Sequence, residues 1–364
     1  MNKKDIAEIK KTLKPENSSI NMVRTCYVTG KKNIVGTNKR KFLALEENEQ
    51  DKYMDILKKA LTGKLNHTLL DLEFPSSAKQ ENGPQRKLYN MMKDGLQDDE
   101  KAEFFFEEVV NTYEHEGNYL ILLAHGNYGI PSKASDGVVL EDTDGIYSFI
   151  ICCICPVELS KPGLCYNADV KTFVNVERDW VAGNPKIAFT FPTFSNRQMN
   201  VNHALYCVKK PSEPHNEIAE TILGCTLPMA VNDQKEAFRE LIQETLGKDA
   251  NVRNIVRLNR EINSFVEELK HEEEAPVMNR KDVEVFLNRT GIDKDVDAQD
   301  FEVMADVVAD EKYVFEGDGV KLQVSKEYVD FVQQTIVNGK PCLLLPLNGI
   351  TLNGIKLMQN PKNK

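Results

Sequence analysis

Five stretches in the middle of the chain decide the fold: NYLILLAHGNYGIP (118–131), IYSFIICCICPVEL (146–159), CYNADVKTFV (165–174), KIAFTFPTF (186–194) and VNHALYCVKK (201–210). All five are rich in aromatic, β-branched and other apolar residues, and turn-prone Gly, Pro, Asn and Asp separate them. Because of their spacing and the lack of helical patterns between them, neighbouring strands are expected to pair antiparallel. The sequence therefore predicts a mainly antiparallel sheet at the centre of the protein.

Helical patterns flank this β-rich centre on both sides. Apolar residues recur at helical spacing over about 1–13, 47–61, 85–95, 99–115, 214–222, 234–247 and 251–270. A β-hairpin is expected within 22–45, where two β-rich runs flank the turn Gly-Lys-Lys-Asn, and a further strand within 67–74. The predicted fold class is α+β, with helices around the sheet.

The charged, proline-containing segment KHEEEAPV (270–277) predicts a linker. After it we expect a small module of two helices, at about 280–290 and 298–309, followed by short strands. Asn338-Gly339 in this module is a strong hairpin turn signal. We therefore divide the chain into three predicted parts: 1–80, a basic helix, hairpin and α/β segment; 81–271, the main α+β body; and 278–364, the C-terminal module.

Composition excludes several classes of protein. None of the 364 residues lies in an apolar run long enough to span a bilayer, and the basic N-terminus lacks the apolar core of a secretory signal. A cytoplasmic location is expected, with the eight cysteines reduced and mostly buried. A zinc site needs a turn between the two ligands of a C-x-x-C pair and normally a second pair elsewhere, whereas in a strand Cys153 and Cys155 of the cluster CCIC (152–155) would face away from Cys152. We expect neither a metal nor a cofactor.

Charge is distributed unevenly along the chain. Residues 1–43 contain eleven Lys and Arg against three Asp and Glu, a net charge of +8, whereas the whole chain carries −10. A basic segment of this kind is compatible with contact to RNA or the ribosome. Its candidate binding residues are Lys31, Lys32, Lys39 and Arg40. The alternative is that the segment lies against the protein's own acidic body.

The chain lacks the sequence motifs of several well-known enzymes. The order of residues excludes a phosphate-binding P-loop, a dinucleotide-binding G-x-G-x-x-G, a zinc-protease H-E-x-x-H and a hydrolase G-x-S-x-G. What remains are polar residues of the β-rich centre, of which His125, Asp179 and Arg197 are the candidate catalytic residues. His125 ends an apolar run beside Gly126, Arg197 could bind a carboxylate or phosphate, and an Arg197–Asp179 pair would explain both residues structurally.

Trp180, the only tryptophan, follows Asp179 directly. Because tryptophan buries a large surface, a place in the core is expected, with ligand binding as the alternative.

Four stretches resemble a family of Gram-positive bacteria described as domain of unknown function 4317. They are MNKKDIAEIK (1–10), EGNYLILLAHGNYGIP (116–131), ICPVELSKPGL (154–164) and DWVAGNPKIAFTFPTFSNRQMNVNHALY (179–206). The resemblance spans nearly the whole chain in the same order and implies a bacterial cytosolic protein. Since the family has no established activity, the resemblance supplies no catalytic residues.

Two functions remain open. The first is a non-catalytic interaction or regulatory protein, whose partner is RNA, the ribosome or another protein. The alternative is a metal-independent hydrolase or transferase with a site near His125, Asp179 and Arg197. An enzyme requires these three side chains to converge in one pocket, whereas a binding protein requires a contiguous basic or apolar surface.

Overall fold

The computed structural model describes residues 1–14, 18–133, 139–175, 177–269, 277–296, 301–310, 312–346, 349–352 and 355–356. The chain divides into two compact units, Met1–Ala230 and Val231–Lys364. Among the helices of the described ranges, none is both long and apolar enough to cross a membrane.

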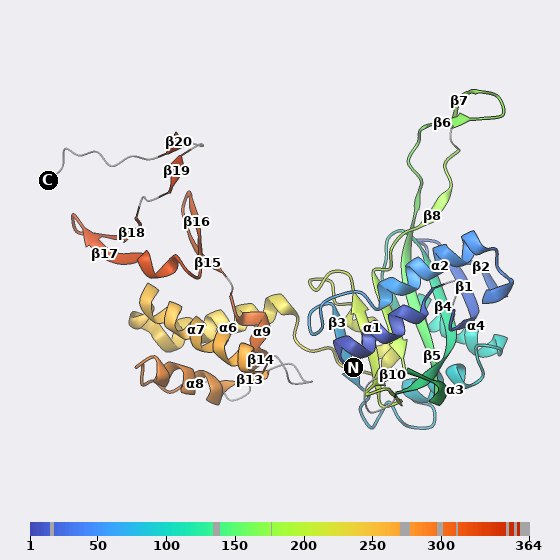
Figure 1. Ribbon diagram of the computed structural model, residues 1–364, viewed down its shortest axis with the longest axis horizontal. Coiled ribbons are helices and arrows are strands. Elements are labelled where there is room, and N and C mark those ends of the chain that lie inside the picture. The colour runs from blue at the N-terminus through green and yellow to red at the C-terminus, as the bar shows by residue number, and fades with distance from the viewer. Residues whose placement is uncertain are drawn as a thin grey trace. The chain divides into compact units, whose positions relative to one another are not determined.

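Unit 1 is built on an antiparallel sheet, which confirms the predicted α+β class (Figure 1). The strand order is β2-β1-β4-β5-β9-β12-β3, and β8 pairs with the end of β5. The bounds of these strands are β1 (Ile20–Val28), β2 (Ile34–Lys41), β3 (Leu69–Glu73), β4 (Asn118–Lys133), β5 (Val139–Leu159), β8 (Trp180–Ala182), β9 (Ile187–Phe191) and β12 (His203–Val208). Two short strands, β10 (Thr193–Ser195) and β11 (Gln198–Asn200), form a separate hairpin.

Both faces of this sheet are apolar, so helices cover both. Alternate residues of a strand point to opposite faces, and β5 accordingly places Cys152 in one core and Cys153 and Cys155 in the other. One face packs against α1 (Lys3–Thr12), the turn η2 (Phe42–Ala44) and α2 (Glu47–Ala60). The other packs against α3 (Pro84–Lys93), α4 (Asp99–Thr112), the short α5 (Asn216–Ile218) and the π-helical turn η3 (Ala219–Leu223).

The expected burial of the cysteines is confirmed for most of them. All eight thiols are free, and Cys26, Cys152, Cys153, Cys155, Cys207 and Cys225 are buried. Burial raises the pKa of Cys26 to about 11 and that of Cys207 to about 12. Cys342 is half-buried and Cys165 is exposed. No group of three or more His, Cys, Asp or Glu in the described ranges could hold a metal ion.

Unit 2 combines helices with short hairpins. Its elements are α6 (Val231–Leu246), η4 (Gly247–Asp249), α7 (Val252–Glu268), β13 (Val277–Asn279), α8 (Arg280–Arg289), β14 (Glu302–Met304), α9 (Ala305–Val308), β15 (Lys312–Gly317), β16 (Val320–Ser325), η5 (Val329–Phe331), β17 (Gln333–Val337), β18 (Lys340–Leu344), β19 (Thr351–Leu352) and β20 (Ile355–Lys356). The predicted turn at Asn338-Gly339 joins β17 and β18. Of the helix predicted over 298–309, residues 298–300 lie outside the described ranges. Glu302–Met304 forms a strand that pairs with β13, and the helix is confirmed for α9.

The sequence-based division placed α6 and α7 with the preceding body. In the structure their apolar residues, such as Leu241, Leu258 and Ile262, form one core with Phe286 and Leu287 of α8. They therefore belong to unit 2. Residues 270–276 of the predicted linker lie outside the described ranges. The three-part division with a linker at 270–277 therefore stays a prediction, which limited proteolysis can test.

Candidate functional site

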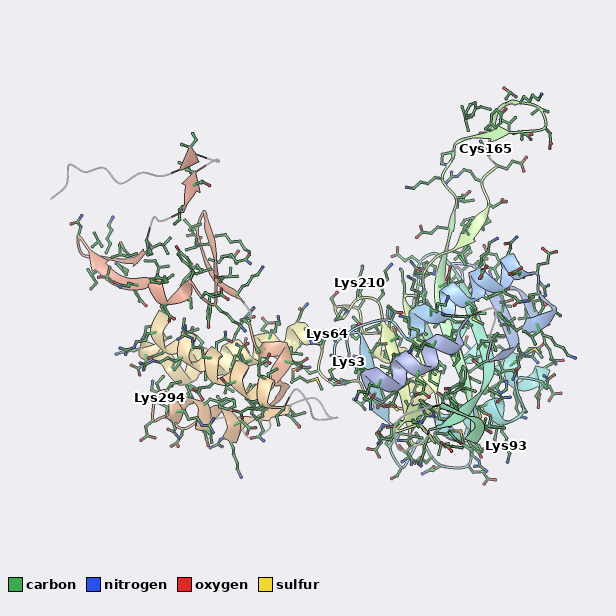
Figure 2. All side chains as sticks on the ribbon, in the orientation of Figure 1. Lys3, Lys64, Lys93, Cys165, Lys210 and Lys294 are labelled. Atoms are coloured by element: carbon green, nitrogen blue, oxygen red, sulfur yellow. The ribbon has the colours of Figure 1, made fainter. Side chains whose placement is uncertain are left out.

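A long arm, residues 159–182, projects from the sheet of unit 1 (Figure 1, green). It begins where β5 extends past the rest of the sheet and pairs only with the three-residue strand β8. Beyond this pair the two legs continue to a terminal hairpin of β6 (Leu164–Asn167) and β7 (Thr172–Asn175). Figure 2 shows Cys165 at this end of the arm, away from the packed body of the unit.

Local hydrogen bonds hold the arm in shape. At its base, the backbone N–H of Ser160 donates to the carbonyl of Asp179 at 2.8 Å, and the Asp179 N–H donates to the Ser160 hydroxyl at 3.1 Å. At its tip, the side-chain oxygen of Asn167 accepts from the N–H groups of Asp169 and Val170 at 2.9 and 3.3 Å. Such side-chain acceptors favour a tight turn. The structure thus places Asp179 at the base of the arm, where its backbone forms hydrogen bonds with Ser160.

The surface of the arm is apolar to an unusual degree. Large hydrophobic side chains are exposed along it: Leu164, Tyr166, Val170, Phe173, Trp180 and Val181. Phe173 is 65% exposed, and its ring meets that of Tyr166 edge to face with the ring centroids 5.6 Å apart. Single exposed apolar residues are ordinary on a protein surface, whereas several on one element are typical of interaction sites.

Trp180 is 55% exposed, so the expectation that it anchors the core was wrong. The physical reason is that β8 pairs with β5 beyond the part of the sheet that helices cover. The sequence shows the arm only indirectly: the stretch 165–174 has the composition of a strand, but Pro162-Gly163 and the charged run 177–179 isolate it from its neighbours.

His125 lies in a different place, on β4, where it faces the side of the sheet covered by α3 and α4. It is 6% exposed, and its ring lies beneath the turn at Gly95, where an added Cβ would be 3.6 Å from Nδ1. Burial lowers the pKa of His125, and the charge of Asp94 acts weakly in the opposite direction. The imidazole is therefore held in its neutral form.

Arg197 lies on the other side of the sheet. It occupies the turn between β10 and β11, donates to the Glu8 carboxylate of α1 at 2.7 Å and also bonds the carbonyl of Pro131. Arg197 thus forms a structural pair with Glu8 rather than the pair with Asp179 that was one of the alternatives. Figure 1 shows β8 and β10 far apart along the sheet. The three candidate catalytic residues are not brought together.

The basic hairpin β1–β2 is largely matched by acids of its own unit. Lys32 pairs with Glu114 at 2.7 Å, Lys39 with Asp99 at 3.0 Å, and Arg40 with Glu49 at 2.7 Å. Hydrogen bonds from Arg24 and Lys39 lower the pKa of Asp99. Lys31 is exposed. These pairs favour the alternative that the basic segment neutralises the protein's own acidic surface.

These features define a class: an α+β protein with an antiparallel sheet, an exposed apolar arm and no converging catalytic residues among those predicted. The family model described as domain of unknown function (DUF4317) matches residues 1–355, and the chain belongs to this family. The resemblance noted in the sequence is thereby confirmed. The comparisons with curated proteins and with solved structures found no match.

Proposed function

We propose that this chain is a non-catalytic, cytoplasmic interaction protein of bacteria that binds a protein partner through the arm. The observation that supports this most strongly is the exposure of the apolar side chains of β6, β7 and β8. The separation of His125, Asp179 and Arg197 supports it further, because a hydrolase or transferase built on them would need them in one pocket.

The charge of the arm indicates the kind of partner. Residues 159–182 contain three basic and three acidic side chains, so the arm is neutral within a chain of net charge −10. A polyanion such as RNA requires an excess of cations at the contact. A neutral, aromatic-rich surface instead fits an apolar groove on another protein, where a few buried aromatic anchors carry much of the binding energy.

In-cell photo-crosslinking tests this proposal. A photoreactive phenylalanine analogue replaces Phe173 in the arm, and in the control it replaces Phe104 of α4, which is also exposed. We expect one cross-linked protein from the Phe173 position that is absent from the Phe104 position. The substitution Leu164→Glu should abolish it without changing thermal stability, because Leu164 is exposed. The partner, once purified, should bind the wild-type chain and not Leu164→Glu.

Equal labelling from both positions, or labelling that survives Leu164→Glu, would contradict the proposal. Cross-linking only to a second copy of this chain, with a dimer in light scattering that Leu164→Glu dissolves, would replace it with self-association.

A further inference from the structure

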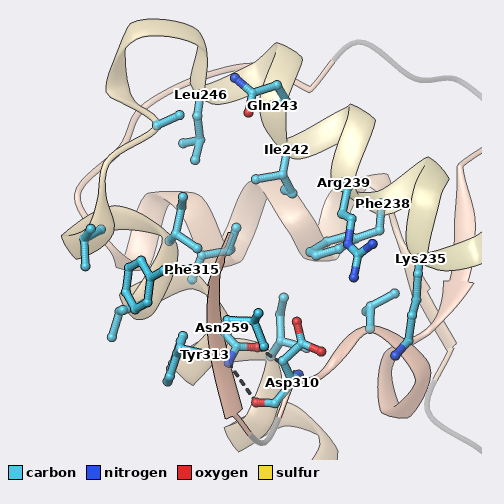
Figure 3. A pocket seen from close by; sticks show the side chains of 18 of the residues that line it. Lys235, Phe238, Arg239, Ile242, Gln243, Leu246, Asn259, Asp310, Tyr313 and Phe315 are labelled. Atoms are coloured by element: carbon cyan, nitrogen blue, oxygen red, sulfur yellow. Dashed lines mark hydrogen bonds between the residues drawn. The ribbon is translucent and has the colours of Figure 1, made fainter. Parts of the chain in front are cut away.

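Unit 2 contains an open pocket of about 760 Å³ that the arm-mediated function does not use (Figure 3). It lies among α6, α7 and β15, whose residues form its walls. Its volume is within the range of about 300–1,000 Å³ that is typical of small-molecule sites.

Most of the wall is apolar. The contributing side chains include Phe238, Ile242 and Leu246 of α6, Leu258 of α7, and Tyr313 and Phe315 of β15. They line this pocket because α6 and α7 turn their apolar faces toward each other, and β15 packs on α7 through Tyr313 and Val256. A ligand here would remove apolar surface from water, which contributes about 25 cal/mol for each Å² buried.

Cations gather at the polar edge of the pocket. Lys235 and Arg239 lie one helical turn apart on α6, and Figure 3 shows both side chains pointing from the helix toward the hollow. Lys312 at the start of β15 also lines it. Within the described ranges, none of these three forms an ion pair. They differ in this respect from Lys32, Lys39 and Arg40 of unit 1.

Two acids line the same pocket, and among the described residues neither forms an ion pair with these cations. Glu316 pairs with Lys321 of β16 at 3.3 Å. Asp310 is fixed through its backbone: its N–H donates to the side-chain oxygen of Asn259 at 3.2 Å, and its carbonyl accepts from the Asn259 amide at 2.9 Å (Figure 3). Setting aside the Glu316–Lys321 pair, three cations face a single carboxylate, so the pocket is electropositive.

We propose that this pocket binds a small amphipathic carboxylate. Its apolar body would lie against Ile242, Leu258 and Tyr313, and its carboxylate would accept hydrogen bonds from Arg239. The planar guanidinium of arginine matches a carboxylate through two parallel hydrogen bonds, which makes Arg239 the residue that determines the ligand's charge. A cationic amphiphile of the same length would be repelled by the three cations.

Displacement of the fluorescent dye 8-anilinonaphthalene-1-sulfonate from the full chain tests the proposal. The competitors are decanoate, 1-decanol and decyltrimethylammonium, which share a ten-carbon chain and differ in charge. We expect decanoate to displace the dye at the lowest concentration and the cation at the highest. Arg239→Gln should weaken decanoate binding about tenfold, since a charge-assisted hydrogen bond is lost. Asp310→Asn should strengthen it about threefold by removing the like charge.

Two further variants complete the design. Val314→Trp should block the pocket without disturbing a core, because Val314 lines it and is 50% exposed. Arg253→Gln on α7 is the matched control, since Arg253 is outside this pocket and should leave decanoate binding unchanged. Equal displacement by decanoate and decanol, an unaltered affinity in Arg239→Gln, or binding that persists in Val314→Trp would each overturn the proposal.

Discussion

Acidification should destabilise unit 1 through His125. Burial holds the pKa of this imidazole in the native state below its ordinary value of 6.5, which is the value in the unfolded chain. Between these two pKa values, the unfolded chain binds a proton that the native state does not bind. The native state is therefore at full stability above pH 6.5 and loses stability as the pH falls, until the native pKa is reached.

The size of the loss follows from linkage. One proton taken up only on unfolding changes the free energy of unfolding by at most about 1.4 kcal/mol per pH unit. By pH 5.5, one unit below the ordinary pKa, His125 should cost up to about 1.4 kcal/mol. Carboxylates with a lowered pKa, such as Asp98 and Asp99, titrate below pH 5.5. They therefore do not contribute to the change in the free energy of unfolding between pH 6.5 and 5.5.

The test compares wild type with His125→Gln, which keeps the size of the side chain but cannot titrate. Hydrogen–deuterium exchange of peptides from β4, measured between pH 5.5 and 7.5 with correction for intrinsic rates, reports the opening of unit 1 alone. We expect the wild type to lose protection on acidification and the variant to lose less. His115→Gln gives a graded comparison: burial also lowers the pKa of His115, but its ring is only half-buried, so this variant should reduce the loss of protection less than His125→Gln does. An identical pH dependence in wild type and His125→Gln would refute the reasoning.

Three further outcomes are expected. A thiol reagent under native conditions should modify Cys165 fast, Cys342 more slowly and the six buried cysteines only after denaturation; rapid modification of any buried cysteine would contradict the packing of the sheet. Replacing Lys31, Lys32, Lys39 and Arg40 of the β1–β2 hairpin by Glu should lower the melting temperature by a few degrees, because three ion pairs are lost. The same variant should retain as much RNA at low salt as the wild type does. Reduced retention would instead support RNA as a partner. Limited proteolysis should cleave first between Glu272 and Met278, and earlier cleavage within 1–230 would show that this boundary is misplaced.

Local patterns were sufficient to predict much of the fold. The period-two alternation of β5 predicted that Cys152 and Cys153 face opposite cores, and the turn residues of β1–β2 and β17–β18 predicted both hairpins. The pattern could not show where a strand leaves the sheet. Residues 165–174 look like core strand because β-branched and aromatic residues have the same local preference in either setting, and only their tertiary neighbours decide exposure.

The candidate sites required tertiary information for the same reason. Arg197 pairs with Glu8, which lies 189 positions away, and no local pattern relates these two residues. The cations of the unit 2 pocket are equally ordinary in sequence, since Lys235 and Arg239 have the spacing of any solvated helix face. They line a pocket only because residues of β15, which is distant in the sequence, line the same cavity.

The order of strands in unit 1 has a consequence for synthesis on the ribosome. β1 pairs with β4 through contacts such as Met22 with His125, and β3 at the opposite edge pairs with β12 through contacts such as Leu72 with Ala204. After the hairpin β1–β2 ends at Lys41, about eighty further residues must be synthesised before β4 begins at Asn118, and β3 waits for still more before β12 is made. Such distant partners slow folding and leave apolar strand edges open in the nascent chain. These edges would stay unpaired until β12 has emerged.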